Sequence, residues 1–323
     1  MYRDTLRQRL TTGSMTLPVM SALTALTWLL PPSLTEDCTA DIRLWWIGLL
    51  LTAVVTYAWV ECNNRNTLLR VRSRMVGSTF LLLTMACPML HQADWTSLPA
   101  LLLLPIYFAL FSTYGRPQAV GGSFHVFLMA GVSSLCCPPL LLLALPLLFS
   151  LSVQMRALTG RTLGAALLGM ILPYWLVFGY ALVADRLTEF ADYLVAAWQY
   201  TPSLPSDAPA WAVGTYLVVA VLSLLSVIHY VRTAYNDKIR TRMFFYAIIG
   251  VEVTLICGGA LLPCHYRTLL PMLLVNSAPL LGHHYTLSRG RSAEIWFCTS
   301  LLILVGLMIA NYLGLWNSWL RFW

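Results

Sequence analysis

Apolar runs long enough to cross a membrane recur along the whole chain. A bilayer core about 30 Å thick requires roughly 20 apolar residues per helix, and reading for such runs identifies about eleven segments. Within lipid, a backbone that satisfies its own hydrogen bonds is either helical or a closed barrel, and runs of this length indicate helices. We place the segments near residues 15–30, 44–60, 75–90, 98–113, 124–137, 138–153, 162–184, 210–230, 243–262, 269–284 and 295–315.

The charge content excludes an ordinary soluble domain. Only 10% of the 323 residues are charged and 59% are hydrophobic, whereas about a quarter of a typical soluble chain is charged. Disordered, collagen-like and small disulfide-rich proteins are excluded as well, because each needs a more polar, glycine-periodic or cysteine-dense chain. The expected fold class is an all-α polytopic membrane bundle that forms one integral domain over residues 1–323.

Basic residues alternate between successive loops, which predicts the orientation of the chain. Lys and Arg accumulate in cytoplasmic loops. Four basic residues fall in the other set of loops, with most of the acids, so we expect a plasma (inner) membrane protein with a cytoplasmic N-terminus and an external C-terminus. The sixteen basic residues assigned to the cytoplasm are Arg3, Arg7, Arg9, Arg65, Arg70, Arg72, Arg74, Arg116, Arg156, Arg161, Arg232, Lys238, Arg240, Arg242, Arg289 and Arg291.

Residues 124–153 are an apolar stretch interrupted by Pro138 and Pro139. Paired prolines cannot continue a helix without losing backbone hydrogen bonds. A single span would also send Arg156 and Arg161 outside, against the charge pattern. We therefore expect two short helices, either as two spans or as a re-entrant hairpin, and both leave every other loop on the same side.

The segment near 185–200 has an amphipathic pattern. Leu187, Phe190 and Leu194 share one helical face, and Glu189 and Asp192 lie on another. This pattern is typical of a helix that lies in the membrane interface. We expect it on the outer surface.

Glu252 is the one acid that we place within an expected span. A carboxylate there costs several kcal/mol unless it is paired or protonated, so it is a functional candidate by default. Two interpretations stay open: a proton-relay or substrate-binding group, and a protonated side chain that bonds a neighbouring helix.

Two further clusters are candidate sites. Glu36, Asp37 and Asp41 lie in the first outer loop, where a carboxylate could act as a catalytic base, although an acidic outer loop also follows from the charge pattern. Basic side chains in one cytoplasmic loop could bind a phosphate or an anionic headgroup, or serve only to orient the chain. These are Arg232, Lys238, Arg240 and Arg242.

Several site classes are not expected. His283 and His284 are adjacent and therefore point about 100° apart on a helix, which disfavours a shared metal. No phosphate-binding, dinucleotide or zinc-protease motif is present, so we expect no metal and no cofactor. The net charge of +7 is spread over short loops, which argues against nucleic-acid binding.

Three stretches resemble an uncharacterised family of polytopic bacterial inner-membrane proteins. They are residues 161–175 (RTLGAALLGMILPYW), 236–246 (NDKIRTRMFFY) and 269–297. The resemblance implies a membrane location but no activity. More distantly, the short proline-broken spans and the acidic first outer loop resemble polyprenyl-phosphate-dependent glycosyltransferases, in which a carboxylate of that loop is the usual base. The loop here is much shorter than theirs.

Three functional classes follow from these patterns. The first is a cell-envelope component that handles a lipid or lipid-linked glycan, and it would require Glu252 or the first-loop acids. The second is a non-catalytic scaffold or assembly factor with a membrane protein partner. The third is a proton-coupled small-solute transporter, which would depend on Glu252.

Overall fold

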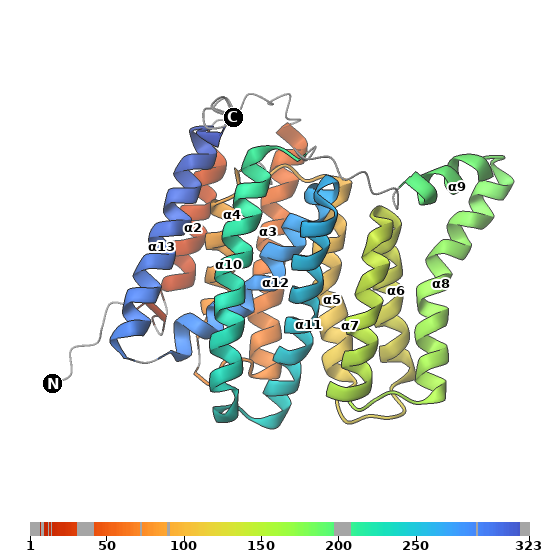
Figure 1. Cartoon of the computed structure of the whole chain (residues 1–323), viewed down its shortest axis with the longest axis horizontal. Coiled ribbons are helices and arrows are strands. Elements are labelled where there is room, and N and C mark those ends of the chain that lie inside the picture. Colours follow the sequence, from red (N-terminus) through yellow and green to blue (C-terminus); the bar gives the residue numbers. More distant parts are fainter. Residues whose placement is uncertain are drawn as a thin grey trace. The chain divides into compact units, whose positions relative to one another are not determined.

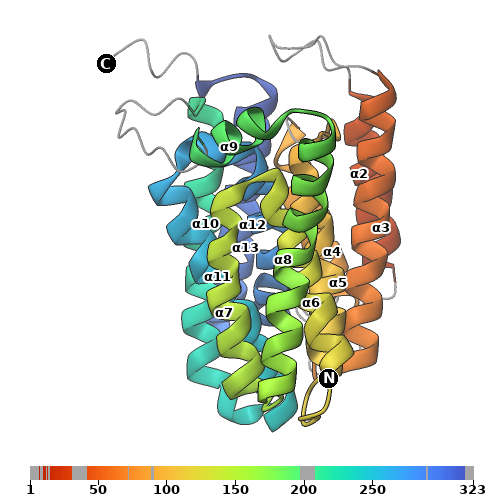
Figure 2. The ribbon, with the colours of Figure 1, turned by 90° about the vertical axis from the view of Figure 1, so that its right-hand side faces the viewer.

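The fold is known from a computed structural model, which describes residues 7, 10, 11, 13, 15–30, 42–71, 73–88, 91–196, 208–288 and 290–316. All regular secondary structure in these residues is helical, as the sequence predicts. Figures 1 and 2 show helices connected by turns and loops, and no strand among the described residues. The chain folds into two compact units, each built from separate stretches of sequence.

Unit 1 comprises residues 1–94, 208–238 and 273–323. The α4 helix packs against both α2 and α3. Most of α12 also belongs to this unit. Its helices are α2 (Thr16–Leu29), α3 (Ile42–Asn66), α4 (Met75–Met85), α10 (Ala210–Thr233), η6 (Ala234–Asn236), α12 (Tyr266–Leu287) and α13 (Arg291–Tyr312).

Unit 2 comprises residues 95–207 and 239–272. Its most extensive packing is between α6 and α8, which lie side by side in Figure 1. Its helices are η3 (Trp95–Ser97), α5 (Leu98–Ser112), α6 (Val120–Cys136), η4 (Pro138–Leu143), α7 (Ala144–Phe149), η5 (Ser150–Gln154), α8 (Gly160–Val183), α9 (Leu187–Ala196), α11 (Ile239–Leu261) and η7 (Pro263–His265).

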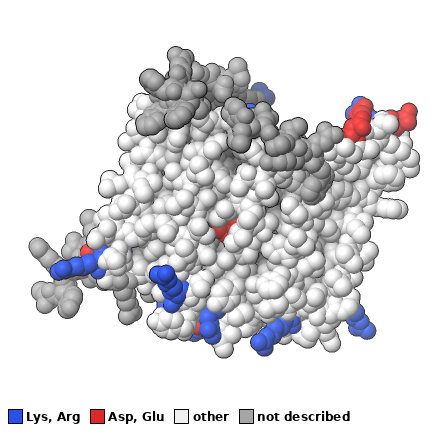
Figure 3. Space-filling view, in the orientation of Figure 1, with Lys and Arg blue, Asp and Glu red and all other residues white. Residues whose placement is uncertain are grey.

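A helical segment lies at each of the expected apolar runs, and six of these helices are long and apolar enough to span a membrane. The six are α3, α5, α8, α10, α11 and α13. In Figure 3 the charged side chains lie mainly at the edges of the visible face, and most of the surface between them is uncharged. The chain therefore has the composition and surface of a membrane protein.

The break in residues 124–153 falls where the paired prolines predict it. The α6 helix ends at Cys136, Cys137 is extended, and η4 begins at Pro138. The second half ends with η5. The carbonyl oxygen of Met155, directly after η5, accepts a hydrogen bond from the backbone N–H of Gly115, which lies just before α6. The two halves therefore form a hairpin that starts and finishes at one end of unit 2.

Two glycines allow α6 and α8 to approach closely. A Cβ atom on Gly169 would lie 2.5 Å from the carbonyl oxygen of Phe124, and one on Gly131 would lie 2.8 Å from that of Met170. Gly164, Ala165 and Gly169 form a stripe of small residues along the start of α8, but a Cβ atom on Gly164 would face open space. The stripe therefore contributes through Gly169, with Gly131 as its counterpart.

The α12 helix is the most enclosed part of unit 1, since residues 273–285 are all buried. It is not one of the six apolar candidates, because it carries buried polar residues such as Asn276 and His283. Pro279 has no N–H to donate to the carbonyl of Val275 one turn earlier. The indole N–H of Trp59 in α3 donates to that carbonyl instead, over 3.1 Å, so the proline is accommodated by a neighbouring helix.

Candidate functional site

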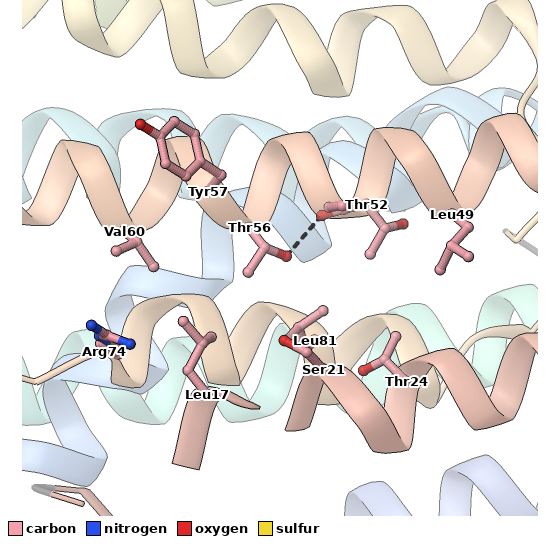
Figure 4. A pocket seen from close by; sticks show the side chains of 11 residues that line it. Leu17, Ser21, Thr24, Leu49, Thr52, Thr56, Tyr57, Val60, Arg74 and Leu81 are labelled. Atoms are coloured by element: carbon pink, nitrogen blue, oxygen red, sulfur yellow. Dashed lines mark hydrogen bonds between the residues drawn. The ribbon is translucent and has the colours of Figure 1, made fainter. Parts of the chain in front are cut away.

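A groove of about 390 Å³ runs along unit 1 between α2 and α3. Leu81 of α4 contributes to its lining, and α4 packs against both flanking helices. Figure 4 shows the side chains of α3 on one side of the groove and those of α2 and α4 on the other. The lining residues are Leu17, Ser21, Thr24, Leu49, Thr52, Ala53, Thr56, Tyr57, Val60, Arg74 and Leu81.

Apart from Arg74 the groove walls are uncharged, and two of their five hydroxyl-bearing residues direct the hydroxyl to their own helix. The hydroxyl of Thr56 donates to the carbonyl of Thr52 within its own helix, over 2.7 Å, and Thr24 bonds Met20 in the same way. Hydroxyls bonded to their own helix present mainly their methyl groups to a neighbour. The groove thus offers a surface that suits a hydrocarbon chain.

Two tryptophans lie beyond the lining residues at one end of the groove. Trp28 lies one helical turn beyond Thr24, and Trp45 lies one turn before Leu49. The indole N–H of each donates to the backbone carbonyl of the other, both over 3.1 Å, and this reciprocal pair joins α2 to α3.

His91 packs against the same two tryptophans. Its ring stacks on Trp28 with 3.5 Å between centroids and meets Trp45 edge-on. Burial lowers the pKa of His91 to about 3, although a bond with the carbonyl of Thr84 opposes the shift. The ring is therefore uncharged at neutral pH.

The other end of the groove carries a positive charge. Arg74 is exposed, lines the groove and caps the start of α4. None of the ion pairs found among the described residues includes it. Figure 4 shows Arg74 at the end of the groove opposite Leu49. A groove with uncharged walls and a cation at one end is complementary to an anionic amphiphile, whose chain is apolar and whose headgroup is negative.

The linker that carries Arg74 is fixed by side chains at both ends. The amide of Asn63 donates to the carbonyl of Ser73 and accepts from the backbone N–H of Leu69. The hydroxyl of Ser73 donates to the carbonyl of Thr11, in the segment ahead of α2. These bonds hold the groove mouth in one conformation.

A buried carboxylate joins the α3–α4 linker to the segment after α10 and to α12. The side chain of Asp237 is fully buried, forms an ion pair with Arg70 and accepts a hydrogen bond from Nε2 of His283 over 3.1 Å. Because these residues come from the α3–α4 linker, the residues after α10 and the end of α12, one carboxylate connects three segments. Arg7 extends the cluster by donating to the carbonyl of Tyr285.

Three further rings lie beside this cluster. His284 stacks between His229 and Trp296, with centroids 4.0 and 5.2 Å away, and its Nδ1 lies 3.2 Å from the hydroxyl of Ser226. Across the described residues no group of His, Cys, Asp and Glu side chains could hold a metal ion. The three rings pack against one another and against Ser226.

The predicted site residues have different outcomes. Glu252 is fully buried in α11 of unit 2. Glu36, Asp37 and Asp41 lie outside the described residues. Of the basic loop, Arg232 and Lys238 belong to unit 1, and Arg240 and Arg242 to unit 2. The guanidinium of Arg240 lies 5.2 Å from the centroid of the Phe244 ring, where it makes a cation–π contact.

The groove residues and Asp237 are absent from the candidates that the sequence indicates. Thr24 and Thr56 look like ordinary small residues within apolar helices, and nothing in the linear pattern pairs α2 with α3. Asp237 lies inside the basic loop and reads as one acid among cations. The only available signal is Arg74 at the start of an apolar run, which the sequence interprets as an orientation signal.

No family model, curated protein or solved structure matches the chain. The family resemblance noted from the sequence therefore stays a prediction. No residue role is transferred from another protein.

Proposed function

We propose that this protein binds an anionic membrane lipid, with one acyl chain in the α2–α3 groove and the headgroup at Arg74. The observation that carries the proposal is the position of Arg74 at one end of a groove whose other lining side chains are all uncharged. The proposal belongs to the lipid-handling class of envelope components that the sequence suggests. The lipid is the ligand, and no reaction is assigned to the bound state.

The orientation expected from the charge pattern agrees with the same proposal. The segments that meet around Asp237 include loops expected in the cytoplasm, and Arg74 belongs to one of them. With about eleven spans and a cytoplasmic N-terminus in the inner membrane, Arg74 lies at the cytoplasmic surface. Anionic lipids give that surface its negative potential, and each nearby basic residue contributes about 1 kcal/mol of attraction.

The competing classes are favoured by fewer observations. A proton-coupled transporter would use Glu252, whose burial in an apolar helix is its single supporting observation. A scaffold would need a protein partner. The groove, at about 390 Å³, has the size of a site for an acyl chain rather than of a protein interface. Handling of a lipid-linked glycan by the acids of residues 36–41 stays a prediction from the sequence.

The test is native mass spectrometry of the full chain released from nanodiscs that contain phosphatidylglycerol and phosphatidylethanolamine in equal amounts. We expect the wild-type protein to retain phosphatidylglycerol in stoichiometric amount. Arg74→Gln should lower the preference for phosphatidylglycerol about fivefold, the equivalent of about 1 kcal/mol. Arg232→Gln is the matched control, because it removes an exposed arginine of the same unit that does not line the groove.

A second pair of variants tests the groove itself. Ala53→Phe should fill the groove and abolish retention, whereas Val54→Phe adds the same ring one position away, where the side chain is exposed and lines no groove. Equal retention by both variants would contradict the proposal. A bare chain that retains a stoichiometric protein partner would favour the scaffold class instead.

A further inference from the structure

One end of unit 2 brings together arginines that are far apart in the sequence. The backbone N–H of Gly115 donates to the carbonyl of Met155 over 2.9 Å, so the α5–α6 loop lies beside the linker between η5 and α8. The hydroxyl of Thr159 in that linker donates to the carbonyl of Pro117 over 3.3 Å, which makes a second connection. The loop and the linker carry three exposed arginines: Arg116, Arg156 and Arg161.

A fourth exposed arginine comes from the start of α11. The guanidinium of Arg240 lies 5.9 Å from the centroid of the Tyr114 ring and 5.2 Å from that of Phe244. Tyr114 belongs to the α5–α6 loop, so the contact places Arg240 beside the segment that carries Arg116. A guanidinium held over aromatic rings is oriented and keeps its charge. We call these four residues the arginine cluster.

No carboxylate among the described residues of unit 2 neutralises the arginine cluster. None of the ion pairs found in the described part of the chain includes one of its arginines. Asp185, Glu189 and Asp192 follow the far end of α8, which is about 36 Å long at 1.5 Å per residue. Glu252 is fully buried within α11. The cluster therefore carries a positive charge that an anionic ligand can neutralise.

A cavity of about 540 Å³ adjoins the arginine cluster. Its lining comes from the end of α5, the α5–α6 loop and the start of α6, and Arg116 is its one charged residue. A phosphate group therefore has room to approach Arg116 from this cavity. The lining residues are Ser112, Arg116, Pro117, Gln118, Ala119 and Gly122.

The local backbone does not account for the arginine at position 156. The φ of Arg156 is +52°, in the left-handed region. The backbone N–H groups of Met155 and Ala157 donate to the carbonyls of Ser150 and Leu151, which closes η5. Glycine is the usual residue at such a helix end because it adopts this conformation without strain. The arginine instead supplies a positive charge together with some backbone strain.

We infer that the arginine cluster binds a lipid whose headgroup carries two phosphate groups. One guanidinium can bind one phosphate bidentately, so four guanidinium groups suit two phosphates better than one. The charge pattern places all four arginines at the cytoplasmic membrane surface, where basic pockets between helices bind such headgroups. The cluster belongs to unit 2 and the α2–α3 groove to unit 1, so the inference goes beyond the proposed function and does not depend on it.

The experiment compares two anionic lipids. The full chain is released from nanodiscs that contain cardiolipin and phosphatidylglycerol with equal numbers of phosphate groups, and native mass spectrometry identifies the retained lipid. We expect the wild type to prefer cardiolipin. Arg116→Gln should lower that preference about fivefold, the equivalent of about 1 kcal/mol. Arg186→Gln is the matched control, because Arg186 is exposed in the same unit but follows the far end of α8.

Arg156→Gly separates the charge of the side chain from its effect on the fold. Glycine adopts the left-handed conformation readily, so this variant should resist thermal unfolding at least as well as the wild type. Its preference for cardiolipin should nevertheless fall about fivefold, because one cation is lost. An unchanged preference in both Arg116→Gln and Arg156→Gly would overturn the inference.

Two further measurements identify the ligand and the site. Inorganic pyrophosphate also carries two phosphate groups, and its binding to a protein that shows no preference for cardiolipin would overturn the assignment to a lipid. Arg74→Gln should not lower the preference for cardiolipin. If it does, cardiolipin binds in the α2–α3 groove, and this inference fails while the proposed function stands. Loss of phosphatidylglycerol retention from the groove alone would refute only the proposed function.

Discussion

At the scale of single residues, burial decides what an ion pair contributes. Arg65 and Arg70 both pair with a carboxylate through Nε, but Arg65 and Glu61 are 68% and 31% exposed, whereas Arg70 and Asp237 are 36% and 0% exposed. An exposed pair gains little because water competes for both partners. Removing one partner of a buried pair leaves an uncompensated charge in a medium of low dielectric constant.

We therefore expect Arg70→Gln to lower the free energy of unfolding by about 3 kcal/mol, and Arg65→Gln to cause no measurable change. Reversible denaturation in detergent micelles, followed by tryptophan fluorescence, measures both variants. His283 still donates to Asp237 in the Arg70 variant, so the protein should fold. If the two variants are equally stable, Asp237 is not the structural centre that the geometry indicates.

At the scale of helices, the α8 side of the α6–α8 contact depends on Gly169 and not on Gly164, which lies earlier in the same helix. Gly169→Ala should destabilise the protein by about 2 kcal/mol, because the added methyl group meets backbone atoms of α6 that cannot rotate away. Gly164→Ala should be neutral or stabilising by up to about 1 kcal/mol, since it improves helix propensity in open space. The same denaturation assay compares them, and equal losses would argue against this interface.

This pair also shows what the sequence can and cannot predict. The positions of the helices follow from apolar length, and the break at Pro138 follows from proline chemistry, so both are predicted correctly. Whether Gly164 or Gly169 faces α6 depends on how the two helices are rotated, which no linear pattern encodes. The groove cannot be predicted from the sequence for the same reason. Its two walls belong to α2 and α3, and their packing against α4 depends on helix rotation.

At the scale of the whole molecule, the number of membrane crossings depends on the hairpin of α6 and η4–η5. Both halves return to the end of unit 2 that carries Arg116 and Arg156, so the hairpin leaves all other loops in place whether it spans or re-enters. Its turn is the discriminating point. Cys136 lies there and is partly exposed, which makes it a native probe.

We expect Cys136, kept as the sole cysteine, to react with a membrane-impermeant maleimide added outside intact cells. A cysteine at Lys238 should react only after the cytoplasmic side is opened, because the charge pattern predicts that this loop is cytoplasmic. Protection of Cys136 from both sides would indicate a re-entrant hairpin. Labelling of position 238 from outside would reverse the orientation, move Arg74 to the outer surface and require the groove to take its lipid from the outer leaflet.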